Sequence, residues 1–247
     1  MSRDLGQPAG KTNLNNLPAA PDGLTLIGRS ETLAQKVKGQ LKEAIMAGHF
    51  SPGEKLTIRR VAGELDVSLT PAREALYNLA SEGALDLRSN GSVYLPALTV
   101  DRIVELTKIR VALESLASRE AVRWINDDEI TKIGALNEDI IKQNTERSFS
   151  KLIDLNWRFH FSIYRASRME HLVRMIESCW LMTGSYLNVI YPKFGDMNDG
   201  INNHIQIFRA LETRDGERLA FAISKDILMA SDSLVDVIES GKKNDKV

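Results

Sequence analysis

Four residues in the second half of the chain could together bind a divalent metal ion. Asn156 and His160 are one helical turn apart, so their side chains share one face of a helix. His204 and Asp226 each lie on the apolar stripe of a different helical segment, and both side chains are therefore expected to point inward. Two imidazoles, one carboxylate and one amide oxygen make a suitable ligand set for a divalent cation.

The spacing along the chain predicts that His204 and Asp226 meet. The polar stretch Arg214–Glu217 is typical of a tight turn between two helices, and both residues are equally far from Asp215. Residues equidistant from such a turn face each other in an antiparallel helix pair. A histidine and a carboxylate inside an apolar core need a partner, because burying them alone is costly. A metal ion would satisfy this need, and a hydrogen-bonded His–Asp pair without metal is the alternative.

The elements that position these residues are helices. From about Val100 onward strand signals disappear, and apolar residues recur with helical spacing. Residues 98–240 are therefore expected to form an all-helical bundle of about six helices that carries the ligand site. Residues 1–25 are rich in Gly, Pro, Asn and Ala and are expected to form a flexible arm, and residues 241–247 a solvated tail.

Composition sets the broad class of protein. Hydrophobic residues make up 43% and charged residues 26% of the 247 residues, which is close to the average of globular proteins. The net charge of -1 means that binding of nucleic acid would need a local basic surface. A single cysteine, Cys179, and the lack of a long apolar run predict a cytoplasmic protein without disulfides or a membrane partner.

Residues 26–97 have the pattern of a winged helix-turn-helix, so the fold as a whole is expected to be mainly α. A helix from about Ser30 to Ala47 is followed by two short helical patterns, Ile58–Leu65 and Ser68–Ser81, with few residues between them. Alternating residues then flank Asn90 and Gly91, a pair that is a strong hairpin signal. The order of these elements is more specific for DNA binding than any one of them.

The second short helix is expected to be the recognition helix. Ser68 and Thr70 are good N-cap residues, and Pro71 suits the first turn. Its N-terminal end would offer donors to phosphates and bases. An arginine taken alone could equally be a solvated side chain. The residues expected to contact DNA are Arg59, Arg60, Ser68, Thr70, Arg73, Arg88, Asn90 and Gly91.

The segments Ile58–Ala62 and Val67–Leu76 resemble the DNA-binding signature of the GntR family of transcription regulators. The helical part is similar to the FCD-type ligand-binding domain of its FadR subgroup, and the resemblance covers residues 30–240. It implies a homodimer, with residues 98–240 as the dimerisation domain, that reads a short palindromic operator in double-stranded DNA. Leu69 is then a further candidate for contact with DNA. One residue departs from the family pattern: Leu69 stands where an arginine commonly reads guanine, and leucine can at most touch a thymine methyl.

The resemblance also implies a function for the helical part, namely a sensor that binds zinc, nickel or manganese. In the family pattern an Asp or Asn and a His on one helix are joined by two later histidines, and Asp226 fills the last of these positions. Arg110 is expected to clamp the carboxylate of an effector, with Ser185 and Tyr186 beside it. The expected function is a repressor of a catabolic operon that a small organic acid releases from DNA.

Two rival functions fit some of the same residues. Two histidines and a carboxylate also describe the metal site of non-haem iron oxygenases. The sequence has no second catalytic constellation, however, and an enzyme would leave the winged module unexplained, so no enzymatic activity is expected. The second rival is a DNA-binding dimer whose helical part binds no ligand.

Overall fold

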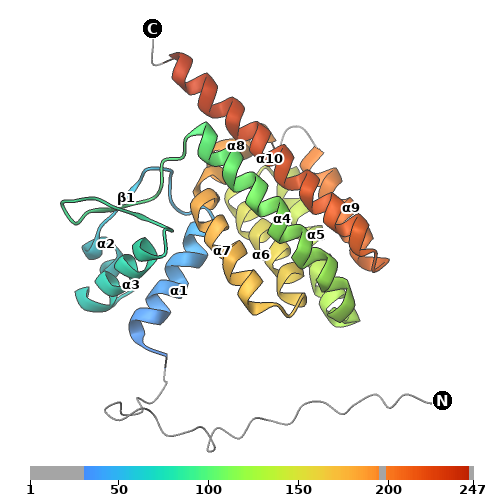
Figure 1. The fold of residues 1–247 in the computed structure, drawn as a ribbon, viewed down its shortest axis with the longest axis horizontal. Coiled ribbons are helices and arrows are strands. Elements are labelled where there is room, and N and C mark those ends of the chain that lie inside the picture. Colours follow the sequence, from blue (N-terminus) through green and yellow to red (C-terminus); the bar gives the residue numbers. More distant parts are fainter. Residues whose placement is uncertain (1–30, 195–198, 245–247) are drawn as a thin grey trace, which may run out of the picture. The chain divides into compact units, whose positions relative to one another are not determined.

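The computed structural model describes residues 31–194 and 199–244, so the arm expected at residues 1–25 lies outside the described residues. The fold is mainly α, as predicted, and Figure 1 shows the order of its elements. The N-terminal elements are α1 (Leu33–Met46), β1 (Lys55–Leu56), α2 (Ile58–Glu64), α3 (Leu69–Ser81), β2 (Asp86–Leu87) and β3 (Val93–Tyr94). The helices that follow are α4 (Val100–Trp124), α5 (Asp127–Thr145), α6 (Phe149–Ala166), α7 (Glu170–Thr183), α8 (Leu187–Phe194), α9 (Asp199–Glu212) and α10 (Gly216–Asn244).

The helix-turn-helix is formed by α2 and α3, which pack against each other, and α3 also packs against α1. Leu76 and Leu79 of α3 are fully buried, and Leu41 and Ile45 of α1 belong to the same core. Between α2 and α3 the chain turns at Asp66 with a φ of 50°, a left-handed conformation that Asp tolerates better than most residues. The short turn fixes the start of α3 on the surface of the module.

The wing is a three-stranded antiparallel sheet in the order β1-β3-β2. The predicted hairpin is β2 and β3, with Asp86 opposite Tyr94 and Leu87 opposite Val93. Its turn holds three residues: Gly91 N–H donates to the Arg88 carbonyl, and Gly91 has a φ of 76°. The strand β1 was not predicted, because two residues are too few to show an alternating pattern.

In the helical domain α4 and α10 lie side by side, and α6 lies in the interior (Figure 1). Phe159, Phe161 and Tyr164 of α6 are fully buried. Within the described residues the domain has seven α-helices instead of about six, because a 3-10 turn at Gly184–Tyr186, η2, separates α7 from the short α8. A Cβ atom at Gly184 would lie 3.0 Å from the Ile45 carbonyl oxygen, so this close approach of η2 to α1 requires glycine.

The C-terminal tail is shorter than expected. Residues 241–247 were expected to be solvated tail, but α10 continues to Asn244. Gly241 did not end the helix because an internal glycine costs only about 1 kcal/mol relative to alanine. None of the described helices is both long and apolar enough to cross a bilayer.

Candidate functional site

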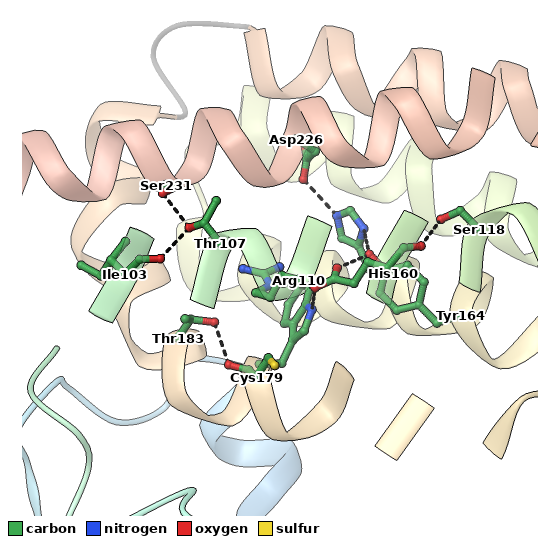
Figure 2. Close-up of polar contacts among 12 residues, drawn as sticks. Ile103, Thr107, Arg110, Ser118, His160, Tyr164, Cys179, Thr183, Asp226 and Ser231 are labelled. Carbon is green, nitrogen blue, oxygen red and sulfur yellow. Dashed lines mark hydrogen bonds and ion pairs between the residues drawn. The ribbon is translucent and has the colours of Figure 1, made fainter. Parts of the chain in front are cut away.

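Three of the four expected metal ligands come together from three helices. His160 of α6 points toward Asp226 of α10, with Nε2 3.3 Å from Oδ2 (Figure 2). His204 of α9 lies beside them, with Nε2 3.8 Å from Asp226 Oδ1. One potential ligand atom of each residue lies within 4.8 Å of the others. The ring of His204 stacks on Phe159 at 4.8 Å between centroids, which fixes its position.

The protonation states favour a cation at this cluster. Burial alone would raise the pKa of Asp226, but His160, His204 and Asn203 outweigh it and hold the pKa at about 2. Burial lowers the pKa of His204 to about 4, against the attraction of Asp226. At neutral pH the carboxylate is therefore charged and His204 is neutral, which are the forms that bind metals.

Unpartnered nitrogen atoms also fit a metal ion. His160 Nε2 and His204 Nδ1 are buried without a hydrogen-bond partner among the described residues. Buried polar atoms of this kind need a partner. For His160 Nε2 a metal ion shared with Asp226 would be that partner, and a proton shared with Asp226 Oδ2 at 3.3 Å is the metal-free alternative. Two imidazoles and a carboxylate suit zinc, nickel or manganese without selecting strongly between them. The donor set thus fits the cation that the sequence predicts.

A cavity opens next to the cluster. Asn156, His204 and Asp226 line one part of it, so a cation held there would face the cavity. The walls elsewhere are largely apolar and aromatic, with Ile103, Trp180, Leu187, Ile190, Tyr191 and Leu234 among the lining residues. An apolar cavity with a few convergent polar groups is the usual form of a small-molecule site.

Arg110 of α4 lines the same cavity. Its Nε–H donates to Glu114 Oε1 at 2.7 Å, and its guanidinium lies 4.7 Å from the ring centroid of Trp180. Burial alone would lower the pKa of Arg110, but Glu114 outweighs it and raises the pKa above its ordinary value. The terminal guanidinium nitrogens bond to no other described residue, and two such N–H groups can bind one carboxylate.

Ser185 and Tyr186, the other two residues expected to contact the effector, differ in their position relative to the cavity. Tyr186 lines the cavity, whereas Ser185 is fully buried and is not among the lining residues. On the tight η2 turn successive side chains point in different directions, which places Gly184 and Tyr186 at the cavity and Ser185 away from it. Trp180 and Glu114 were not among the expected residues, although the spacing of Glu114 from Arg110 is a recognisable ion-pair signal.

Tyr186 also connects the cavity to the segment that follows the wing. Its hydroxyl oxygen accepts a hydrogen bond from Leu98 N–H at 2.5 Å, and the hydroxyl donates to the Pro96 carbonyl at 3.5 Å. Nearby, Asn188 of α8 donates to the carbonyl of Gly48, just after α1. The cavity wall at η2 and α8 is therefore bonded to the backbone at both ends of the segment that holds the helix-turn-helix and the wing.

The N-terminal end of α3 presents the expected recognition residues. Ser68, Leu69, Thr70 and Arg73 are all exposed, and the side chain of Leu69 is 47% exposed. Ser68 is the N-cap residue, yet its side chain makes no capping hydrogen bond, which leaves the hydroxyl available to a partner. Arg73 makes no ion pair or hydrogen bond with another described residue. This surface offers donors and one apolar contact.

The other expected DNA contacts lie on α2 and the wing. Arg59 is exposed, whereas Arg60 is held by Glu54 and by Glu64, the latter at 2.8 Å. Arg88 lies 3.7 Å from the ring centroid of Tyr94. At the tip of the wing Asn90 Oδ1 accepts from Ser92 N–H at 3.0 Å, and the neighbouring Gly91 is exposed. Arg60 is thus engaged within the module, while Arg59 and Arg73 are not.

A winged helix-turn-helix bonded to a helical domain with an internal cavity defines a DNA-binding regulator with an effector domain. The model of bacterial regulatory proteins of the gntR family matches residues 33–95, and that of the FCD domain matches residues 105–227. The chain therefore belongs to the GntR family of transcription regulators, with an FCD domain as its C-terminal part. FCD domains bind small-molecule effectors, and the reported relatives are regulators, not enzymes.

Named relatives agree with this membership. The chain is 28% identical over 188 residues to the HTH-type transcriptional regulator McbR of Escherichia coli (strain K12), covering 75% of this chain and 85% of McbR. It is 25% identical over 190 residues to the gluconate operon transcriptional repressor of Bacillus licheniformis, covering 73% of this chain and 76% of that repressor. The solved structure of E. coli McbR/YncC has a TM-score of 0.77 at 26% identity, covering 83% of this chain and 98% of the other.

Proposed function

We propose that the protein is a homodimeric repressor of a catabolic operon, which a small organic acid releases from a palindromic operator in the cytoplasm. The observation that carries this proposal is a single cavity that is lined by Arg110, His204 and Asp226. A divalent zinc, nickel or manganese ion held by Asn156, His160, His204 and Asp226 would keep positions open toward the cavity. The metal and Arg110 would together bind one carboxylate.

The path from effector to DNA runs through Tyr186. The side chain touches the cavity, and its hydroxyl bonds to the backbone between the wing and α4. An acid that moves Tyr186 changes the position of this segment and so the separation of the two DNA-binding modules of a dimer. The effect is a population shift, so it requires that the acid prefers one arrangement of the modules.

The name of a relative gives a starting point for the effector. The Bacillus licheniformis relative is a repressor of a gluconate operon, and gluconate carries one carboxylate. The test is a gel-retention assay on DNA upstream of the encoding gene, with gluconate and a panel of other small carboxylic acids. Acid-dependent release supports the proposal. Binding that no acid changes would leave a regulator without this sensor function, and lack of DNA binding altogether would contradict the proposed repressor.

Replacing Arg73 by alanine should weaken operator binding roughly ten- to hundredfold, because one base or phosphate contact is worth about 1 to 3 kcal/mol. Arg73 is exposed and has no partner within the described chain, so the unfolding temperature should not change. Fluorescence anisotropy with labelled operator DNA measures the affinity. Arg123→Ala, at an arginine that is 68% exposed near the end of α4, is the matched control and should bind DNA as the wild type does.

A further inference from the structure

One carboxylate of the helical domain is completely buried and does not belong to the candidate ligand set. Glu114 of α4 has 0% of its surface exposed. Its Oε1 accepts from Arg110 Nε at 2.7 Å and from Trp180 Nε1 at 3.1 Å, and its Oε2 accepts from the Tyr164 hydroxyl at 2.5 Å. The guanidinium of Arg110 supplies the opposite charge that a buried carboxylate requires.

The bond from Tyr164 determines which nitrogen of His160 carries the proton. A hydroxyl has one proton to donate, and Tyr164 donates it to Glu114. The same hydroxyl oxygen lies 3.2 Å from His160 Nδ1, so it must accept there, and Nδ1 must carry the ring proton. His160 Nε2 is then left with a lone pair that faces Asp226 Oδ2. A lone pair that faces a carboxylate at this distance requires a cation between them: a metal ion when one is bound, and a second ring proton on Nε2 when none is.

We propose that Glu114 is a positioning residue of the candidate metal centre, which acts through Tyr164 to hold His160 in the tautomer whose Nε2 can bind a metal. Histidines that bind metals commonly donate their other N–H group to a neighbouring acceptor, and loss of that support lowers metal affinity 10- to 100-fold. The consequence for metal binding rests on the proposed function. The proton on Nδ1 is a property of the chain without metal.

The variant Glu114→Gln tests this role at nearly unchanged side-chain size. Arg110 and Trp180 both donate to the same atom of residue 114, so the amide oxygen must take that position. The amide NH2 group then faces Tyr164 and donates to it, and the tyrosine proton turns to His160 Nδ1. The ring proton moves to Nε2, bonds to Asp226 and occupies the metal position. Affinity for Ni²⁺ should fall roughly 10- to 100-fold.

Two measurements on the full-length protein give separate readouts. Ring nitrogen shifts of metal-free protein labelled with 15N-histidine report whether Nδ1 of His160 carries a proton. Calorimetric titration with Ni²⁺ reports the affinity. The wild type should show a protonated Nδ1, and Glu114→Gln should show an unprotonated Nδ1 with the proton on Nε2. Glu105→Gln, at an exposed carboxylate of the same helix, is the control and should change neither readout.

Tyr164→Phe provides a second variant if Glu114→Gln does not fold. It keeps the buried ring and the pair of Arg110 with Glu114, removes only the link to His160, and should give the same change of tautomer and affinity. A wild type with an unprotonated Nδ1, or variants with the wild-type protonation of Nδ1 and Ni²⁺ affinity, would overturn the inference. A wild type with a protonated Nδ1 but no affinity for Ni²⁺ supports the role of Glu114 and contradicts the metal in the proposed function instead.

Discussion

Adding Zn²⁺ or Ni²⁺ to metal-free wild-type protein is expected to raise its unfolding temperature by roughly 5 to 10 °C and to leave that of Asp226→Ala unchanged. An ion at about 100 times its Kd stabilises the folded state by about 2.7 kcal/mol. In a chain of this size each kcal/mol corresponds to about 2 to 4 °C. Asp226 is the one carboxylate of the cluster, and without it two neutral imidazoles must hold a doubly charged ion.

The variant separates loss of metal from loss of structure. Asn203 donates to Asp226 at 3.1 Å and also to the Ala222 carbonyl at 2.9 Å, so it keeps one bond in Asp226→Ala. The lowered pKa of Asp226 means that its ionised carboxylate stabilises the fold, so the metal-free variant should unfold somewhat below the metal-free wild type, and each protein is compared with itself before and after metal. Thermal unfolding before and after chelation, with the metal content determined by mass spectrometry, makes the comparison, and Asp232→Ala on the exposed side of α10 is the control. If metal raised the unfolding temperatures of the wild type and of Asp226→Ala equally, the ion would have to bind at another place.

Replacing Tyr186 by phenylalanine should leave the binding of acid and of DNA nearly intact but largely abolish the effect of one on the other. The ring still lines the cavity, while the bonds to Leu98 and Pro96 are lost. Coupling between two sites is typically worth about 1 to 3 kcal/mol, or a 5- to 150-fold change in affinity. We expect this factor to fall toward one, measured as operator affinity with and without the releasing acid.

Thr183→Val is the matched control for the coupling experiment. Thr183 lines the same cavity, but its hydroxyl donates only to the Cys179 carbonyl of its own helix. This variant should therefore keep the wild-type change of operator affinity on addition of acid. A Tyr186→Phe protein that still releases DNA in response to acid would show that the signal travels by another route, such as the contact of Asn188 with Gly48.

The DNA-binding module was the most predictable part of the fold. Its signals are local: the spacing of Leu76 and Leu79, the proline in the first turn of α3, and the pair Asn90 and Gly91 at the hairpin. Each acts within a few residues, so the sequence pattern carries the geometry. The short strand β1 pairs with a residue range almost 40 positions away along the chain, and such pairing leaves no local pattern.

The candidate site was only partly accessible to the same reasoning. The antiparallel turn between α9 and α10 predicts that His204 and Asp226 lie at one level, because both belong to one hairpin of helices. His160 comes from α6, and its place beside His204 and Asp226 depends on how distant helices pack. The sequence pattern therefore identified His160 as a candidate ligand, and the family resemblance indicated which residues it would join. Glu114 was overlooked because a glutamate four positions after an arginine is usually a solvated surface pair.

The engagement of Arg60 with Glu54 and Glu64 has a consequence for the response of DNA binding to ionic strength. Each phosphate that a protein neutralises releases condensed counterions and adds about 0.9 to the slope of log affinity against log salt. A guanidinium already balanced by two carboxylates displaces few of them. We therefore expect the module to take less of its affinity from counterion release than its arginines would suggest, and more from contacts at the N-terminal end of α3, which would distinguish one sequence from another.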